Sequence, residues 1–310
     1  MRLTVAISGG LLLAWLSAST LMPAPASAQT AGSEGLSPTL AAIKNAHVVR
    51  LGYRESSPPF SFLDQANRPI GYSLELCEAI VEEIGVEVDD PDLKIAYVRV
   101  TSEDRIDAVL QNKIDLECGS TTANAERGKR VAFSPLMFVA GTKLMVPKAS
   151  SVSGVADLKG KTVVVTKGTT NEQAMHAVDR KFSLGLNIVA AGDHEQSYQM
   201  LADGKADAFA TDDILLYGLI VRHKAQDKFR VTGDYLSYDP YGIMFRKGEP
   251  QLSAVVERTF RKLGSNHDLV PLYNKWFVAR LPTGERLNVP ISLQLEEAFK
   301  AMDDSPGANN

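Results

Sequence analysis

The chain has 310 residues, with 33 basic and 37 acidic side chains that give a formal net charge of −4. No basic run stands out, so the sequence excludes the concentrated positive surface that nucleic-acid binding requires, and we expect no nucleic-acid partner. Two cysteines and five scattered histidines show no zinc spacing, and the sequence has neither a phosphate loop nor a G-x-S-x-G nucleophile elbow. We therefore expect no metal, no cofactor and no catalytic residue, and any positive charge that serves function must be local.

The N-terminus is typical of a secretory signal peptide over residues 1–28. Arg2 precedes an apolar run at residues 11–16, and Ala26-Ser27-Ala28 has the A-x-A form of a cleavage site. Nearby prolines argue against the alternative, which is a buried N-terminal helix. We expect cleavage after Ala28 and export to the periplasm.

The cysteines would then lie in an oxidising compartment. Cys77 and Cys118 could form a disulfide there, and two buried free thiols are the alternative. The length that remains after cleavage is sufficient for two lobes.

A strand and a proline turn place the first candidate arginine. Residues 48–53 are predicted to form a buried strand, and Pro58 and Pro59 stop the chain from continuing as strand or helix. Arg54 therefore lies at the carboxyl end of a strand, where open α/β sheets bind ligands. A solvated surface charge is the alternative for Arg54 taken alone.

Two helices follow in the same half of the chain. Apolar residues at helical spacing run from Leu74 to Ile84, and Ser73 is the expected N-cap of that helix. A second helix opens within residues 101–105, where Arg105 in the first turn opposes the helix dipole. Arg105 therefore needs an anionic partner, which is either a neighbouring acid or a ligand.

The stretch from Glu117 to Arg127, ECGSTTANAER, follows a short apolar strand and gathers a glycine, three hydroxyl residues and an arginine. Gly119 allows a ligand to approach the backbone closely, and the hydroxyl groups can hydrogen-bond an anion. Arg127 adds a planar, permanently charged group that matches a carboxylate. A strand exit with a solvated arginine is the alternative.

Residues 138–147 are extended and apolar, and we interpret them as a crossing into a second α/β half. There a strand over residues 162–166 meets Gly168-Thr169-Thr170 at the start of a helix. This pattern repeats the anion-receptive arrangement of the first half, with simple capping by Thr169 or Thr170 as the alternative.

Two further helix starts carry candidate polar residues. Asp193 is the expected N-cap of a helix and leaves His194 in its first turn, where a structural or solvated histidine is the alternative. A strand over residues 206–211 leads into Asp212 and Asp213, of which one can cap a helix while the other meets a cation.

The end of the chain is predicted to complete the fold. Residues 241–245 form the last predicted strand, and two helices follow around residues 251–265 and 268–277. Their aromatic residues are expected in the core. A final helix is predicted near residues 293–302, with a mobile polar end after it.

Six motifs, in order and correctly spaced, give the chain a resemblance to a known family. They are GYRESSPPFSF, GYSLEL, TSEDR, ECGSTTANAER, VVTKGTTNE and ATDDILL. They resemble those of the periplasmic solute-binding proteins of polar amino-acid ABC transporters, family 3, and within it the glutamate/aspartate-binding branch.

The resemblance implies an α/β fold of two Rossmann-like lobes joined by a two-strand hinge, the periplasmic binding protein type II fold. Lobe 1 would comprise residues 29–139 plus 240–310, and lobe 2 residues 140–239. It also implies a monomer that binds L-glutamate or L-aspartate by lobe closure and delivers it to an ABC permease in the inner membrane.

The resemblance also implies a role for each candidate site residue. The α-carboxylate would be held by Arg127, Thr122 and the backbone N–H of Thr170. The α-ammonium group would be held by Asp212 and Ser120. The side-chain carboxylate would be held by Arg54, Ser102, Arg105 and His194. Two arginines on one wall repel unless an anion lies between them, so we expect acidic ligands to be preferred over their amides.

Two rival functions stay open at this point. The first is a periplasmic enzyme, similar to a dehydratase, on the same scaffold, with His194 or Glu55 as a general acid or base. The second is a sensor that presents its ligand to a receptor instead of a permease. The sequence also does not determine whether glutamate or aspartate binds better.

Overall fold

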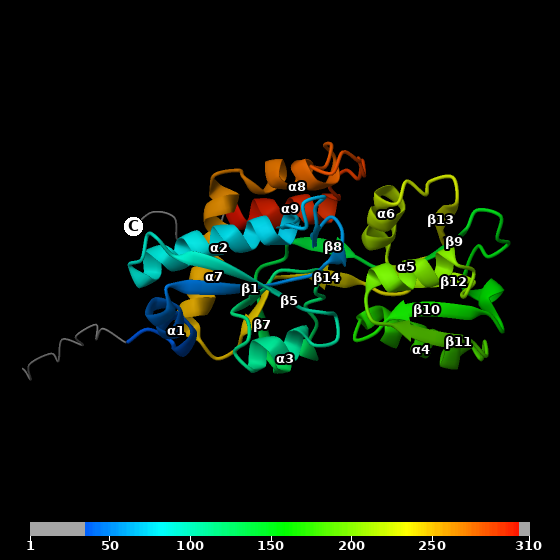
Figure 1. The fold of residues 1–310 in the computed structure, drawn as a ribbon, viewed down its shortest axis with the longest axis horizontal. Coiled ribbons are helices and arrows are strands. Elements are labelled where there is room, and N and C mark those ends of the chain that lie inside the picture. Colours follow the sequence, from blue (N-terminus) through cyan, green and yellow to red (C-terminus); the bar gives the residue numbers. More distant parts are fainter. Residues whose placement is uncertain (1–34, 304–310) are drawn as a thin grey trace, which may run out of the picture. The chain divides into compact units, whose positions relative to one another are not determined.

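The computed structural model describes residues 35–303, and two five-stranded sheets organise them (Figure 1). The predicted signal peptide and the polar C-terminal end after residue 303 lie outside the described residues. Within residues 35–303, none of the helices combines the length and the apolar character that a membrane crossing requires.

The first sheet has the strand order β5-β1-β6-β15-β7. Four of its strands run in the same direction, and β15 runs antiparallel to both of its neighbours. The strands are β1 (Val48–Tyr53), β5 (Lys94–Arg99), β6 (Leu116–Glu117), β7 (Val131–Phe133) and β15 (Met244–Arg246).

The second sheet has the order β11-β10-β12-β9-β13, and β9 runs antiparallel to the other four strands. The strands are β9 (Thr142–Pro147), β10 (Thr162–Thr166), β11 (Asn187–Ala191), β12 (Ala208–Asp212) and β13 (Phe229–Thr232). We call the parts built on the first and second sheets the first and second lobe.

Helices accompany both sheets. Those of the first lobe are α1 (Pro38–Ala46), α2 (Tyr72–Val88), α3 (Arg105–Leu110), α7 (Pro250–Ser265), α8 (Leu269–Phe277) and α9 (Leu293–Asp303). Those of the second lobe are α4 (Thr170–Phe182), α5 (His194–Ala202) and α6 (Asp213–Arg222). The described residues also form two short 3-10 helices, η1 (Arg127–Lys129) and η2 (Val155–Leu158). A small sheet contains β2 (Ser56–Ser57), β3 (Ser61–Leu63) and β4 (Pro69–Ile70).

Two antiparallel strands join the lobes. The chain leaves the first lobe through β8 (Phe138–Ala140) and returns through β14 (Asp239–Tyr241), and the two strands pair with each other. This is the two-strand hinge that the sequence predicts, and the α/β fold class is confirmed.

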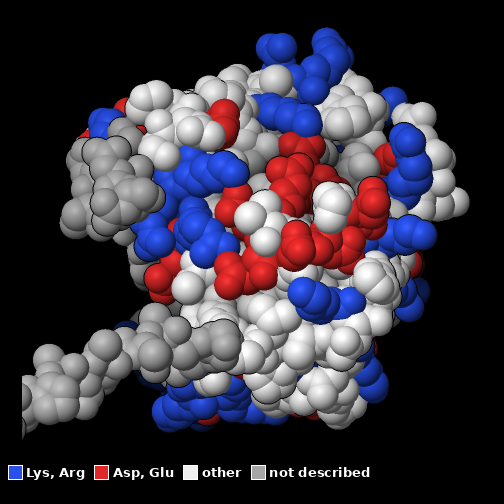
Figure 2. All heavy atoms as spheres, turned by 90° about the vertical axis from the view of Figure 1, so that its left-hand side faces the viewer, with Lys and Arg blue, Asp and Glu red and all other residues white. Residues whose placement is uncertain are grey.

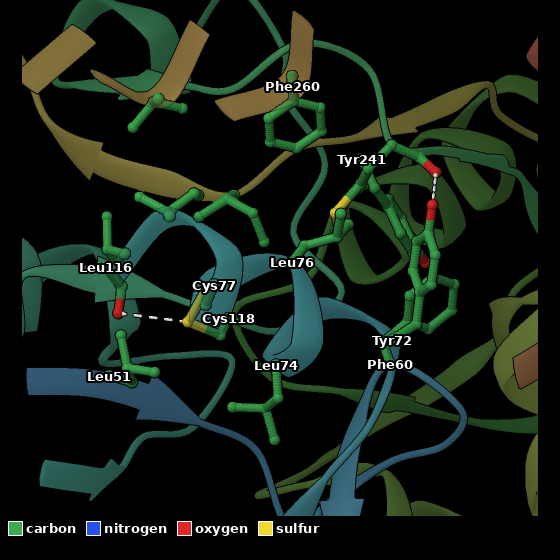
Figure 3. Packing of buried hydrophobic residues seen from close by; sticks show 14 of the residues in the cluster. Leu51, Phe60, Tyr72, Leu74, Leu76, Cys77, Leu116, Cys118, Tyr241 and Phe260 are labelled. Atoms are coloured by element: carbon green, nitrogen blue, oxygen red, sulfur yellow. Dashed lines mark hydrogen bonds between the residues drawn. A yellow bond between two sulfur atoms is a disulfide. The ribbon is translucent and has the colours of Figure 1, made fainter. Parts of the chain in front are cut away.

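The core of the first lobe lies between the sheet and α2 (Figure 3). Leu51 and Leu116 of the sheet are fully buried there, and a disulfide joins Cys77 of α2 to Cys118 just after β6. The disulfide ties α2 to the loop that follows a sheet strand. Aromatic residues lie at the hinge end of this core: Phe60, Tyr72, Phe138, Tyr241, Tyr273, Trp276 and Phe277. The predicted burial of Tyr273, Trp276 and Phe277 is confirmed.

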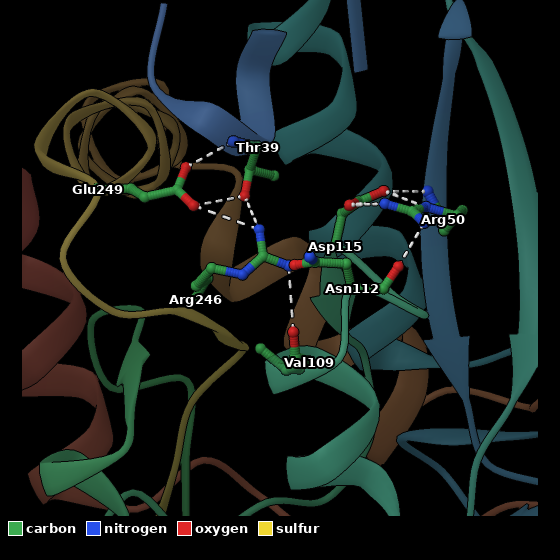
Figure 4. A network of polar contacts seen from close by, with 7 residues as sticks. All are labelled: Thr39, Arg50, Val109, Asn112, Asp115, Arg246 and Glu249. Carbon is green, nitrogen blue, oxygen red and sulfur yellow. Dashed lines mark hydrogen bonds and ion pairs between the residues drawn. The ribbon is translucent and has the colours of Figure 1, made fainter. Parts of the chain in front are cut away.

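A polar network fastens α1 to the same lobe (Figure 4). The Arg246 guanidinium donates to the Thr39 hydroxyl, to Glu249 Oε1 at 3.2 Å and to the Val109 carbonyl at 3.1 Å. Beside it, Arg50 pairs with Asp115 at 2.6 Å. Because the partners come from α1, α3 and the segment before α7, the network joins distant parts of the chain.

Two local predictions are wrong. Gly71, not Ser73, is the N-cap residue of α2, and the Ser73 hydroxyl donates to the Gly119 carbonyl at 2.8 Å. The predicted strand over residues 241–245 is split, because Tyr241 pairs with Phe138 in the hinge while Met244 belongs to the first sheet.

Candidate functional site

Arg54 reaches the site because β1 and β6 are parallel neighbours. Gly52 of β1 pairs with Glu117 of β6, so the residues that follow the two strands emerge side by side. Arg54 is only 1% exposed, and its Nη2 donates to the Ser102 hydroxyl. Its Nη1 has no hydrogen-bond partner among the described residues.

Arg105 and Arg127 lie near the same point and are also buried. Arg105 begins α3, and its Nε has no hydrogen-bond partner within the described chain. Arg127 begins η1, and its guanidinium donates to the Thr122 carbonyl at 2.9 Å and to the Gly168 carbonyl at 3.4 Å. Gly168 belongs to the second lobe, so Arg127 contacts both lobes.

The two threonine candidates also meet from opposite lobes. The hydroxyl of Thr122 lies 3.2 Å from that of Thr170, and it donates to Asp239 Oδ1 at 3.1 Å. Thr170 begins α4, whose N-cap is Thr169, one of the two predicted caps. The N-terminal turn of α4 therefore faces the loop that carries Arg127.

The three arginines form a cluster of positive charge. Burial, and next the charge of Arg105, lower the pKa of Arg54 to about 10 and that of Arg127 to about 9. Burial also lowers the pKa of Arg105. Both pKa values lie above neutral pH, so Arg54 and Arg127 stay charged, and the cluster favours an anion.

His194 adds a neutral group to this cluster. Its Nδ1 lies 2.7 Å from the Thr166 hydroxyl, and the predicted cap Asp193 does accept a hydrogen bond from the Gln196 N–H. Burial, followed by the charges of Arg54 and Arg105, lowers the pKa of His194 well below its usual value. The ring is therefore neutral at pH 7 and adds no further positive charge.

Asp212 supplies the negative side of the site. It is 3% exposed and lies at the end of β12, where Oδ1 accepts from Asn171 Nδ2 at 2.8 Å and Oδ2 accepts from the Tyr241 hydroxyl. Its side chain makes no capping hydrogen bond to α6. Burial, and next the charge of Asp239, raise the pKa of Asp212 to about 7. A cation beside Asp212 would favour its ionised form.

Ser120 is the least defined of the predicted residues. It is buried on the loop that follows β6, and its hydroxyl has no hydrogen-bond partner in the described part of the chain. The contacts above link the other predicted residues to one another directly or through the charges of the arginines.

The sequence interpretation missed four buried polar residues around this site. They are Glu117, Asn171, Asp239 and Tyr241. Glu117 stands in a motif that was singled out, but its charge received no role there. Asn171 follows the Gly-Thr-Thr pattern directly, whereas the hinge residues carry no local signal because β8 and β14 are far apart in the sequence.

An acidic hollow elsewhere on the first lobe does not match this chemistry. It has a volume of about 650 Å³ and lies between α2 and β5, with Glu78, Glu82, Asp89 and Asp90 among its lining residues. Figure 2 shows acidic side chains gathered on the face at that end of the lobe. Its charge would repel the anion that the arginine cluster favours.

The buried arrangement suits a ligand with two negative groups and one positive group. The arginines offer guanidinium donors, two of them with unpartnered nitrogens among the described residues, and Asp212 offers a carboxylate. The same chain matches the model of the bacterial extracellular solute-binding proteins, family 3, over residues 49–279. The chain belongs to this family.

Two curated relatives are similar to this chain over most of its length. The L-glutamate/L-aspartate-binding protein of Pseudomonas aeruginosa is 39% identical over 274 residues, which are 88% of this chain and 91% of the relative. The glutamate/aspartate import solute-binding protein of Salmonella typhimurium is 36% identical over 274 residues, with the same two coverages.

A solved structure supports the same family and fold. A mutant of ArgBP from T. maritima superposes with a TM-score of 0.70 and 28% identity, and the match covers 78% of this chain and all of that one. The predicted type II binding-protein fold and the predicted family are therefore confirmed.

Proposed function

We propose that this protein is the periplasmic substrate-binding component of an ABC transporter and that it captures glutamate or aspartate. The observation that carries the proposal is the buried cluster of Arg54, Arg105 and Arg127 together with the buried carboxylate of Asp212. An acidic amino acid has two carboxylates and one ammonium group and matches these charges. The names of two relatives that are more than one-third identical support the ligand class.

Each end of the ligand has a proposed set of partners. Arg127, Thr122 and the backbone N–H of Thr170 hold the α-carboxylate, while Asp212 and Ser120 hold the ammonium group. The side-chain carboxylate is held by Arg54, Ser102, Arg105 and His194. The unpartnered guanidinium nitrogens of Arg54 and Arg105 support this last group, because buried donors without acceptors are costly.

Binding proceeds by closure of the lobes about the hinge. The proposed ligand residues come from both lobes and all except the half-buried Thr170 are buried, so a ligand enters when the lobes are apart and stabilises the closed state. We place lobe 1 at residues 29–139 and 240–310 and lobe 2 at 140–239, supported by the hinge strands that end at Ala140 and begin at Asp239.

The partner of the closed, monomeric form is a permease of the inner membrane. A relative named as an import solute-binding protein supports transport over sensing, and both relatives described above are named as binding proteins. Export through a signal peptide cleaved after Ala28 places the protein in the periplasm.

Calorimetry of the mature protein with the twenty amino acids tests the ligand. We expect glutamate and aspartate to bind with nanomolar to micromolar dissociation constants, which correspond to about −12 to −8 kcal/mol. Glutamine should bind at least an order of magnitude more weakly, because an amide leaves the arginines without charge compensation. Tight binding of another amino acid, with no heat from either acidic one, would refute the proposal.

A further inference from the structure

Glu117 is a buried carboxylate that the proposed ligand contacts do not use. It ends β6 and is fully buried. Its Oε2 accepts a hydrogen bond from the Thr121 hydroxyl at 2.6 Å, which fixes the carboxylate in one orientation. Its Oε1 has no hydrogen-bond partner among the described residues. A buried carboxylate with a free oxygen is costly unless positive charge lies close by.

The space beside Glu117 is shaped by Gly119. A Cβ at Gly119 would lie 2.4 Å from Glu117 Oε1 and 2.8 Å from Cγ of Arg54. The carboxylate and the stem of Arg54 therefore both pack against this glycine, and only a residue without a side chain fits there. Glu117 therefore lies next to the side chain of Arg54 in the arginine cluster.

All three arginines interact with this one carboxylate. Burial lowers the pKa values of Arg54, Arg105 and Arg127, and the charge of Glu117 opposes that lowering in each of them. The acids next to Arg105 in sequence make hydrogen bonds or ion pairs to other residues, and of the two only Asp104 also acts through its charge on Arg54 and Arg105. Glu103 pairs with Lys167 at 2.8 Å, and Asp104 Oδ1 accepts the Thr101 N–H at 2.7 Å.

The charge balance then fits one class of ligand. Asp239 also acts on Arg127, but its carboxylate accepts hydrogen bonds from the Thr122 and Ser237 hydroxyls. Three guanidinium groups and Glu117, the acid that acts on all three, leave two net positive charges, and an acidic amino acid brings two carboxylates to that region. Asp212 is left to meet the ammonium group. Without Glu117 the cluster would carry one positive charge more than the ligand neutralises.

We propose that Glu117 is a specificity-determining residue. Its fixed negative charge reduces the net positive charge of the arginine cluster to two, which the two carboxylates of the ligand balance. The proposal rests on the proposed function. In the ligand-free protein Glu117 stabilises the cluster, whereas in the complex it repels the ligand carboxylates. It therefore lowers the preference for acidic ligands over their amides.

The variant Glu117→Gln tests this role in calorimetry with glutamate and glutamine. We expect the ratio of the two dissociation constants, glutamine over glutamate, to rise by at least about tenfold, because a buried charge close to the ligand carboxylates has been removed. The melting temperature of the ligand-free variant should fall, and glutamate should raise it by more than in the wild type.

Two matched variants separate charge from shape. Glu117→Asp keeps the charge and should keep the wild-type ratio within about threefold. Glu249→Gln removes another buried carboxylate, which bonds Thr39 and Arg246 outside the site, and should lower stability without changing the ratio. A ratio that is unchanged or lower in Glu117→Gln would overturn the proposal and leave Glu117 with a structural role only.

If the Glu117→Gln variant folds only in the presence of ligand, a refolding measurement replaces calorimetry. Recovery from urea in saturating glutamate is then compared with recovery in saturating glutamine. Recovery in glutamate alone supports the proposed role of Glu117, and equal recovery in both overturns it. If the wild type binds neither glutamate nor aspartate, the proposed function fails. If the wild type binds them and the variant keeps the wild-type ratio, only this inference fails.

Discussion

Arg127 is held in position by backbone carbonyls of both lobes. It donates to the Thr122 carbonyl of the first lobe and to the Gly168 carbonyl of the second. A guanidinium group can make these bonds and still present donors to a carboxylate, because its five N–H groups lie in one plane. A lysine keeps the charge but has no such planar fork.

The substitution Arg127→Lys should therefore weaken glutamate binding by roughly 10- to 300-fold, the loss expected for one or two charge-assisted hydrogen bonds. Arg130→Lys is the matched control, because Arg130 is more than half exposed and pairs with Asp107 on the surface. Calorimetry of both variants is the measurement. An Arg127→Lys variant within threefold of the wild type would remove Arg127 from the ligand contacts.

If Asp212 binds the ligand as proposed, we expect binding to depend on pH. Its pKa is raised to about 7 in the ligand-free protein by burial and by the charge of Asp239, whereas an unfolded aspartate titrates near pH 4. The folded state thus binds the proton more tightly than the unfolded state. This group's contribution to stability is full below about pH 4 and is lost as the pH rises through about 7.

Ligand binding should release a proton below pH 7. The ammonium group of the ligand favours the ionised carboxylate, so affinity should rise up to about tenfold per pH unit from pH 5.5 to 7 and then level off. Calorimetry at pH 6 in buffers of different ionisation enthalpy measures the released protons. Asp212→Asn should bind more weakly and release none. Equal proton release in wild type and variant would assign the effect to another group.

At the scale of elements, the disulfide fixes α2 against the loop that carries residues of the proposed ligand site. Cys77 lies on α2 and Cys118 just after β6, and the two are 41 positions apart in sequence. The Ser73 hydroxyl, also on α2, bonds the Gly119 carbonyl of the same loop. Both contacts hold the loop onto the helix.

Replacing both cysteines with alanine should lower the free energy of unfolding by roughly 2–4 kcal/mol, because the unfolded chain regains the freedom of a loop of this length. Urea unfolding of the double variant and of the wild type, each with and without reductant, measures the change. The wild type in reductant should approach the double variant. If reductant leaves the wild-type curve unchanged while the double variant unfolds earlier, the loss comes from packing.

At the scale of the whole molecule, Gly168 determines how closely the lobes approach. Its φ is +75°, and a Cβ there would lie 2.7 Å from the Cα of Glu103 and 2.9 Å from the Ser102 carbonyl oxygen. These are backbone atoms of the first lobe and cannot turn aside as a side chain could. Next to this contact, Lys167 of the second lobe forms an ion pair with Glu103 of the first lobe at 2.8 Å.

Gly168→Ala should hold the lobes apart and weaken glutamate binding by at least about tenfold, because the ligand residues of the two lobes would no longer meet. Gly204→Ala is the control, since Gly204 has nearly the same φ, +72°, and nothing within 4 Å of the added Cβ. It should cost about 1 kcal/mol of stability and leave affinity unchanged. Small-angle scattering with saturating glutamate should show the compact form in the control and a more open one in Gly168→Ala. Equal affinities in both variants would contradict this role.

Much of the fold could be predicted because its signals are local. The strand over residues 48–53 and the N-cap residues Thr169 and Asp193 follow from apolar patterning and capping preferences, and they occur where expected. The same capping rule predicts Ser73 as the N-cap of α2, and this prediction is wrong because the Ser73 hydroxyl donates to the distant Gly119 carbonyl. A local rule fails where a tertiary contact offers a better partner.

The sequence by itself determined the family, the two α/β halves and the places where arginines follow strands, because these depend on spacing along the chain. Only the tertiary structure decided the environment of each charge. It placed Glu117 beside three arginines and Tyr241 of the hinge beside Asp212, and it gave β14 and β15 to different sheets. The physical reason is that burial and Coulomb energies depend on distances in space, which spacing in the sequence does not fix.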